Sequence, residues 1–150
     1  MPTNTVTSPL PSLPPKPPPR VLGPITRTDV VVYQGASGDF EPMHHDEPFA
    51  KAAGMPAPIV VGMYPAGALI AWATDWLGPR NVREVHTRWR APMWPGDTLT
   101  IDGEAQLNDE GSVRVELTGV NQDGRTVLLG HARFVIAATS GDEPQTGATA

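Results

Sequence analysis

The sequence predicts one α+β domain in which a curved antiparallel sheet wraps around a single apolar helix. Two observations predict this arrangement. Residues 62–79 are apolar around almost the whole helical circumference, and after Pro79 the hydrophobic pattern changes to an alternation with a period of two. A chain of 150 residues has room for one such domain with one core. We therefore expect one functional site.

The two ends of the chain have compositions that do not fit a packed core. Half of the 18 prolines precede residue 25, and proline removes the backbone donors that helices and central strands need. We expect residues 1–21 to form an extended, polyproline-like or disordered arm, with docking on an aromatic groove as the alternative. Residues 138–150 are small and polar and are expected to be a disordered tail. The domain then spans residues 22–137.

Two short helices are expected before the apolar helix. One covers residues 28–34, with Thr28 as its N-cap and glycines after its end. The other spans about residues 46–53, begins at the acidic Asp46 and stops before Gly54.

The apolar helix has clear limits in the sequence. Pro65 is tolerated in a first turn, Gly78 suits the residue after a helix, and Pro79 prevents continuation. The segment leaves almost no polar face, so protein should surround it on most sides. A membrane span is disfavoured, because the segment is shorter than the roughly 20 residues required and contains Asp75.

Four later segments have the alternating pattern of half-buried strands. They are residues 85–91, 99–107, 113–117 and 126–136. Turn signals separate them, of which Asp123-Gly124 is the strongest hairpin signal. The segments therefore predict a four-strand antiparallel meander. A sheet of this kind wrapped around one apolar helix is a hot-dog arrangement.

Charge and cysteine content exclude several classes of protein. The 16 acidic residues outnumber the 11 basic ones, for a formal charge of −5, which disfavours nucleic-acid binding through bulk charge. Without cysteine there is neither a disulfide framework nor a thiolate zinc site. The N-terminal residues lack the pattern of a signal peptide. We therefore expect a cytoplasmic protein that does not act on nucleic acid or in a membrane.

The stretch SGDFEPMHHDEP, residues 37–48, concentrates groups that can transfer protons. Asp39 and His44 are separated by four residues that include Pro42, so they can converge only through an irregular loop. A carboxylate and an imidazole can hold one water and exchange protons with a neighbouring atom, which suits reversible addition of water to a double bond. With an α,β-unsaturated thioester, negative charge develops on the enolate oxygen. Free N–H groups at the start of the apolar helix, at Gly62, can stabilise that charge.

Residues 33–50, YQGASGDFEPMHHDEPFA, resemble the signature of the MaoC-like hot-dog family, which includes R-specific enoyl-CoA hydratases and 3-hydroxyacyl dehydratases. The family pattern is approximately Tyr-Ala, a small residue, Ser-Gly-Asp, any residue, Asn-Pro, an aliphatic residue and His. PIVVGM, residues 58–63, and WPGDTL, residues 94–99, are further family landmarks, so the resemblance covers about residues 25–137.

This resemblance implies reversible hydration of a trans-2-enoyl thioester to a 3-hydroxyacyl thioester, linked to coenzyme A or to a carrier protein. It implies a catalytic dyad of Asp39 and His44, with the Gly62 N–H as oxyanion donor and with no cofactor. It also implies a dimer, either with a second copy or with another hot-dog subunit. In such a dimer the two sheets join edge to edge, and acyl tunnels lie near the interface.

Two positions depart from the family pattern. Glu41 stands where the family has Asn before Pro, and Val61 stands where the family commonly has His before Gly-Met. An extra carboxylate near Asp39 can disturb the pair's proton affinities or the water site. Glu41 therefore motivates an alternative, a non-catalytic or half-catalytic acyl-binding subunit of a hetero-oligomer. A further alternative is a dehydratase or cyclase of polyketide assembly.

Substrate contacts are expected from residues outside the dyad. Met63 and Tyr64 follow Gly62 directly and are expected to line the acyl pocket. Arg88 and Arg90 belong to a local basic cluster that can receive the phosphates of coenzyme A or of a carrier-protein arm. A solvated strand face explains these two arginines equally well.

Histidine side chains are also common metal ligands, so a metal site is an alternative use of these residues. His44, His45 and Asp46 would form a two-histidine, one-carboxylate set, but three consecutive ligands are geometrically awkward. His86 and His131 lie far away along the chain, in expected strands. We therefore expect no metal site, and His45 is expected to be a solvent-facing neighbour or a supporting residue of His44.

Overall fold

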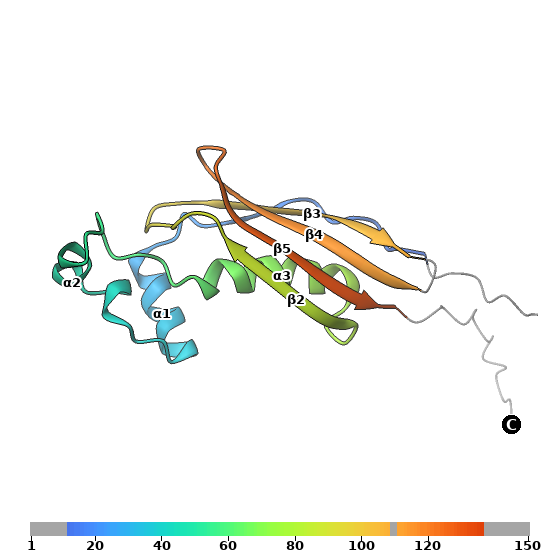
Figure 1. Cartoon of the computed structure of the whole chain (residues 1–150), viewed down its shortest axis with the longest axis horizontal. Helices are drawn as coiled ribbons and strands as arrows, with labels where there is room; N and C mark the ends of the chain where they lie inside the picture. The colour runs from blue at the N-terminus through green and yellow to red at the C-terminus, as the bar shows by residue number, and fades with distance from the viewer. Residues whose placement is uncertain (1–11, 109–110, 137–150) are drawn as a thin grey trace, which may run out of the picture.

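The computed structural model describes residues 12–108 and 111–136, so most of the expected arm and all of the expected tail lie outside the described residues. Its elements are shown in Figure 1. They are β1 (Arg20–Leu22), α1 (Arg27–Ser37), the 3₁₀ turn η1 (Pro42–His44), α2 (Glu47–Ala52), α3 (Met63–Leu77), β2 (Val82–Trp89), β3 (Leu99–Leu107), β4 (Ser112–Asn121) and β5 (Thr126–Val135).

The five described strands form one antiparallel sheet in the order β1-β3-β4-β5-β2. β3, β4 and β5 form a meander as predicted, but β2 pairs with β5 at the far edge and not with β3. The prediction of a four-strand meander in chain order is therefore wrong for the first strand. Alternation identifies a strand but not its partner, and the partner is set by the route that the chain takes around α3. β1, three residues paired with β3, was not predicted.

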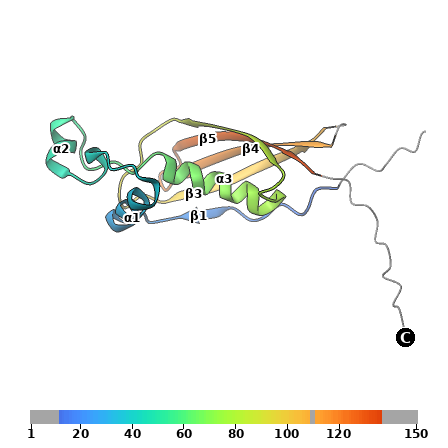
Figure 2. The ribbon, with the colours of Figure 1, turned by 90° about the horizontal axis from the view of Figure 1, so that it is seen from below.

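Helix α3 lies along one face of this sheet and contacts all five strands (Figures 1 and 2). Its buried side chains include Leu69 and Trp72, which pack into the core. The helix approaches so closely that a Cβ at Gly103 of β3 would lie 3.0 Å from the Trp72 ring. The same Cβ would lie 2.6 Å from the Glu116 carbonyl oxygen of the neighbouring strand β4. The predicted fold class, a curved antiparallel sheet around one long apolar helix, is confirmed.

Helix α1 begins earlier than predicted, because Thr26 and not Thr28 is its N-cap. The Thr26 hydroxyl accepts a hydrogen bond from the Asp29 N–H at 3.1 Å, and the Asp29 carboxylate accepts one from the Thr26 N–H at 2.7 Å. This reciprocal capping box satisfies two backbone donors at once and fixes the start of the helix. Gly38 ends α1 with φ 75°, a left-handed conformation that favours glycine.

The described end of the proline-rich arm, residues 12–19, packs against the chain's own helix α3. The indole N–H of Trp76 donates to the Pro14 carbonyl oxygen at 3.0 Å, and that of Trp72 donates to the Pro18 carbonyl oxygen at 3.0 Å. Extended prolines leave their carbonyl groups free for such donors. Over these residues the arm is therefore part of the packed domain.

Helices α1 and α2 lie beyond one end of the sheet and do not cover its face (Figures 1 and 2). Among residues 12–108 and 111–136, no helix has both the length and the apolar character needed to cross a bilayer. The loop between α1 and α2 carries Asp39 and His44 and lies at this end of the molecule, where α3 begins.

Candidate active site

His44 ends the 3₁₀ turn and is held by a backbone carbonyl. Its Nδ1 lies 2.8 Å from the Ile59 carbonyl oxygen, and only 10% of its side chain is exposed. Because a carbonyl oxygen can only accept, Nδ1 carries the proton in this contact. In the neutral ring, Nε2 is then left with a free lone pair. The segment before α3 thus fixes both the orientation and the tautomer of His44.

Asp39 faces this free nitrogen across a short gap. Its Oδ2 lies 3.8 Å from His44 Nε2, which is longer than a hydrogen bond. A water molecule about 2.8 Å from both atoms would be within hydrogen-bond distance of each and would bridge them. Since an ionised carboxylate and a neutral Nε2 both accept, that water would donate both of its protons and keep a lone pair for attack. The structure therefore brings the two predicted proton-transfer groups together.

Gln34 holds the loop that carries Asp39, and the sequence analysis missed it. It is 2% exposed, and its Nε2 donates to the Asp39 carbonyl oxygen at 2.8 Å and to the Glu41 carbonyl oxygen at 3.3 Å. Its Oε1 lies 3.2 Å from His45 Nδ1. The available signal was its spacing of four from Val30, which places both residues on the buried face of α1.

Glu41, the departure from the family's Asn, contributes to the loop through its backbone. Its N–H donates to Asp39 Oδ1 at 3.3 Å, and its carbonyl oxygen accepts from Gln34. The residue itself is exposed, and within the described residues its carboxylate forms no ion pair. The loop geometry therefore does not depend on the side chain at position 41.

The three residues considered as consecutive metal ligands point to different partners. His44 binds a backbone carbonyl, and His45 faces Gln34. The Asp46 carboxylate accepts a hydrogen bond from the Phe49 N–H at 2.9 Å and is the N-cap of α2. Asp46 therefore starts a helix as expected, and the three side chains do not converge.

Gly62 is the N-cap of α3 and lies under the indole of Trp89 from β2. Its carbonyl oxygen accepts a hydrogen bond from Trp89 Nε1 at 2.9 Å, and a Cβ at Gly62 would lie 3.1 Å from the same nitrogen. Within the described residues, the Gly62 N–H donates no hydrogen bond, as the position of a helix N-terminus allows. Trp89, which nothing in the sequence places here, therefore shapes the start of this helix.

His44 and Gly62 line one cavity of about 390 Å³, a size typical of small-molecule sites. Its remaining wall is almost entirely apolar and comes from four regions of the chain. The other lining residues are Met43, Ile59, Val60, Pro65, Trp89, Ala91, Pro92, Met93 and Val127. An imidazole and a helix N-terminus thus face an apolar space that can receive an acyl group.

The four expected substrate contacts are not gathered at this cavity. Met63 is exposed, and Tyr64 stacks on Tyr33 with ring centroids 5.0 Å apart. Burial is the main cause that raises the pKa of the Tyr64 hydroxyl, and the negative charge of Asp29 on α1 adds to this effect. Arg90 is exposed just beyond β2, whereas Arg88 lines a separate cavity on the sheet.

The family can now be assigned. The model of the MaoC like domain matches residues 12–127, which is most of the chain. The chain belongs to the MaoC-like family. The predicted family is thereby confirmed, and its signature residues Asp39 and His44 are those that the fold places face to face.

Two named relatives of this MaoC-like chain are hydratases. It is 31% identical over 90 residues to the 3-oxo-4,17-pregnadiene-20-carboxyl-CoA hydratase beta subunit of Mycobacterium tuberculosis, covering 59% of this chain and 70% of that protein. It is 33% identical over 98 residues to the peroxisomal enoyl-CoA hydratase 2 of Arabidopsis thaliana, covering 63% of this chain but only 30% of that protein.

A solved structure gives the same result for the fold. The ChsH1-ChsH2 complex from Mycobacterium tuberculosis contains a chain that superposes with a TM-score of 0.71 at 26% identity. The match covers 80% of this chain and 94% of that chain.

Proposed function

We propose that this chain catalyses the reversible hydration of a trans-2-enoyl thioester to a 3-hydroxyacyl thioester. The observation that carries the proposal is the convergence of His44 and Gly62 on one apolar cavity, with Asp39 Oδ2 3.8 Å from His44 Nε2. The names of the relatives support the same chemistry, since they are hydratases of acyl-CoA compounds.

In the hydration direction, Asp39 and His44 orient the water, and its oxygen forms a bond to the β carbon. The electrons of the double bond move toward the thioester carbonyl, and the Gly62 N–H stabilises the enolate oxygen. One proton of the water passes to the dyad, and the α carbon takes up one proton as the enolate collapses. The net change is addition of H and OH, and dehydration follows the same steps in reverse.

The substrate class follows from the walls of the site. A cavity of about 390 Å³ holds the reactive end of an acyl chain but is too small for a whole acyl-CoA. The carrier, coenzyme A or a carrier protein, therefore lies outside the cavity on the surface of the protein. Arg90, exposed beyond the end of β2, is the better placed of the two expected phosphate contacts.

A partner subunit is part of this proposal. Most of the large hydrophobic side chains that the described residues expose lie at the end of the molecule formed by α1, α2 and the start of α3. They are Val31, Val32, Phe40, Phe49, Met63 and Trp89. β2 is also an eight-residue edge strand that can pair with a second sheet. The edge and the apolar end meet at Trp89, the last residue of β2, so one partner can contact both.

The same features favour a second candidate, a subunit that is active only beside another hot-dog subunit. One relative is named as a beta subunit, and a similar structure is a complex of two named proteins.

An activity assay tests both candidates. The purified chain alone is mixed with a short trans-2-enoyl-CoA, and hydration is followed by the loss of absorbance of the conjugated enoyl thioester. Activity of the chain alone supports a homo-oligomeric hydratase. Activity only after addition of a second hot-dog subunit supports the second candidate, and inactivity in both mixtures contradicts the proposed reaction.

A further inference from the structure

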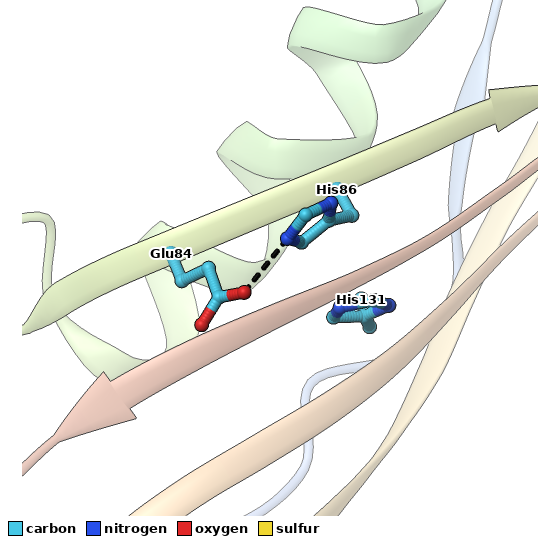
Figure 3. Close-up of side chains that lie close together, drawn as sticks. All are labelled: Glu84, His86 and His131. Carbon is cyan, nitrogen blue, oxygen red and sulfur yellow. Dashed lines mark hydrogen bonds and ion pairs between the residues drawn. The ribbon is translucent and has the colours of Figure 1, made fainter.

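A second group of chemically active side chains lies on the face of the sheet opposite α3. Glu84 and His86 come from β2, and His131 comes from β5 (Figure 3). The register of the two strands pairs His86 directly with His131. Two residues that the sequence separates widely are therefore neighbours on a rigid ladder, outside the cavity that contains His44.

The geometry of this Glu84/His86/His131 cluster is close to that of a metal site. One possible ligand atom from each residue lies within 4.8 Å of the other two, and Glu84 Oε1 is 2.7 Å from His86 Nε2. The two imidazole rings stack with their centroids 4.6 Å apart. Ligand atoms of a tetrahedral ion with bonds of about 2.0–2.2 Å lie about 3.3–3.6 Å apart. Small side-chain rotations that separate Glu84 from His86 slightly and bring any more distant ligand atom closer would fit an ion.

The exposure and the contacts of the three side chains in this cluster allow that rearrangement. The side chains of His86 and Glu84 are 59% and 45% exposed. Within the described residues, the ring nitrogens of His131 form no hydrogen bond, so they are available as ligands. Arg133 contacts Oε2 of Glu84, at 3.3 Å, so an ion bound to Oε1 would replace only the contact of that oxygen with His86.

We propose that Glu84, His86 and His131 form a binding site for a divalent transition-metal ion, with Zn²⁺ as the ion whose ligand preferences they fit. Two imidazole nitrogens and one carboxylate oxygen are ligands that Zn²⁺ takes in proteins, and a water would complete the tetrahedron. Hard ions such as Mg²⁺ prefer sets made only of oxygen ligands. The bound ion would tie edge strand β2 to β5.

Titration of the untagged, chelator-treated full chain with ZnCl₂ at neutral pH, followed by calorimetry, tests this proposal. We expect one Zn²⁺ per chain and a melting temperature that rises with Zn²⁺ concentration, because the ion binds the folded state. His86→Ala and His131→Ala should each weaken binding at least tenfold. Both side chains lie on the solvent face, so the melting temperature without metal should stay near that of the wild type.

His44→Ala is the matched control, because it removes a histidine at the other site and should leave Zn²⁺ affinity unchanged. Titration with Co²⁺ gives a second readout, since ligation by histidine in a tetrahedral site produces an intense visible absorption band. We expect that band in the wild type and in His44→Ala, but not in His131→Ala. Equal Zn²⁺ affinity in the wild type and in a His86→Ala/His131→Ala double variant would overturn the proposal, as would loss of binding in His44→Ala alone.

Discussion

At the scale of single residues, the loop that carries Asp39 depends on a side chain that lies outside the proposed pair of Asp39 and His44. The amide of Gln34 reaches from α1 to the carbonyl oxygens of Asp39 and Glu41. The family pattern has Asn at position 41, where this chain has Glu. This chain therefore arranges the loop with an amide from the helix before it, while the side chain at position 41 faces solvent.

Replacing Gln34 by Leu tests this role. The substitution leaves two carbonyl oxygens without their donor, which costs about 1–3 kcal/mol of folding free energy. A displaced Asp39 should lower kcat by roughly 10²-fold, since displacements of about 1 Å have effects of that size. KM should change little, because Gln34 does not line the cavity. Gln106→Leu, at an exposed position on β3, is the control. An unchanged kcat in Gln34→Leu would show that the loop keeps its geometry without the Gln34 amide.

Glu41→Asn tests the departure from the family pattern. Because the contacts of Glu41 are made by its N–H and carbonyl oxygen, the variant should keep them. We expect kcat/KM to stay within about an order of magnitude of the wild type, with the same pH profile. A gain of several orders of magnitude would instead mean that the carboxylate at position 41 suppresses the dyad.

Some residues of the candidate site can be predicted from the sequence, and others cannot. Asp39, His44 and Gly62 stand in motifs that resemble the family signature, so the sequence alone suggests them. Gln34 and Trp89 contact the site only through the way α1 and β2 approach it. Such contacts between separate elements have no local sequence pattern.

At the scale of secondary-structure elements, the contact between α3 and the sheet depends on glycines. Gly103→Ala would place its Cβ 2.6 Å from the Glu116 carbonyl oxygen and 3.0 Å from the Trp72 ring. We expect a loss of about 1–3 kcal/mol of stability in urea denaturation, as for overpacked cores. Gly67→Ala is the matched control, since no atom lies within 4 Å of its added Cβ and α3 gains helix propensity. Equal stability of the two variants would contradict this packing.

The helices and strands were largely predictable, because periods of 3.6 and 2 are set by which side of each element is buried. α3 was expected within residues 62–79 and is Met63–Leu77. The pairing of β2 with β5 was not predictable, because it depends on the path of the chain past α3. The start of α1 was misplaced because two threonines compete for the cap, and Asp29 selects the earlier one.

At the scale of the whole molecule, the apolar end formed by α1 and α2 is where we propose that a partner docks. Val32 and Phe40 are 66% and 65% exposed, which is unusual for side chains so apolar. A double variant Val32→Glu/Phe40→Glu should shift the chain from dimer to monomer in sedimentation velocity. Val135→Glu, an exposed apolar position at the far end of β5, is the control and should leave the dimer intact. A wild type that sediments as a monomer would contradict a homodimer.

The central claim is that Asp39 and His44 act together on one water. The most direct measurement compares kcat for trans-2-enoyl-CoA hydration in Asp39→Asn, His44→Ala and the double variant, each in the oligomeric state in which the wild type is active. We expect each single variant to lose on the order of 10²–10⁴-fold in kcat. The double variant should lose little more, because groups that act as a unit are not additive. Full activity in either single variant would show that the water is activated elsewhere.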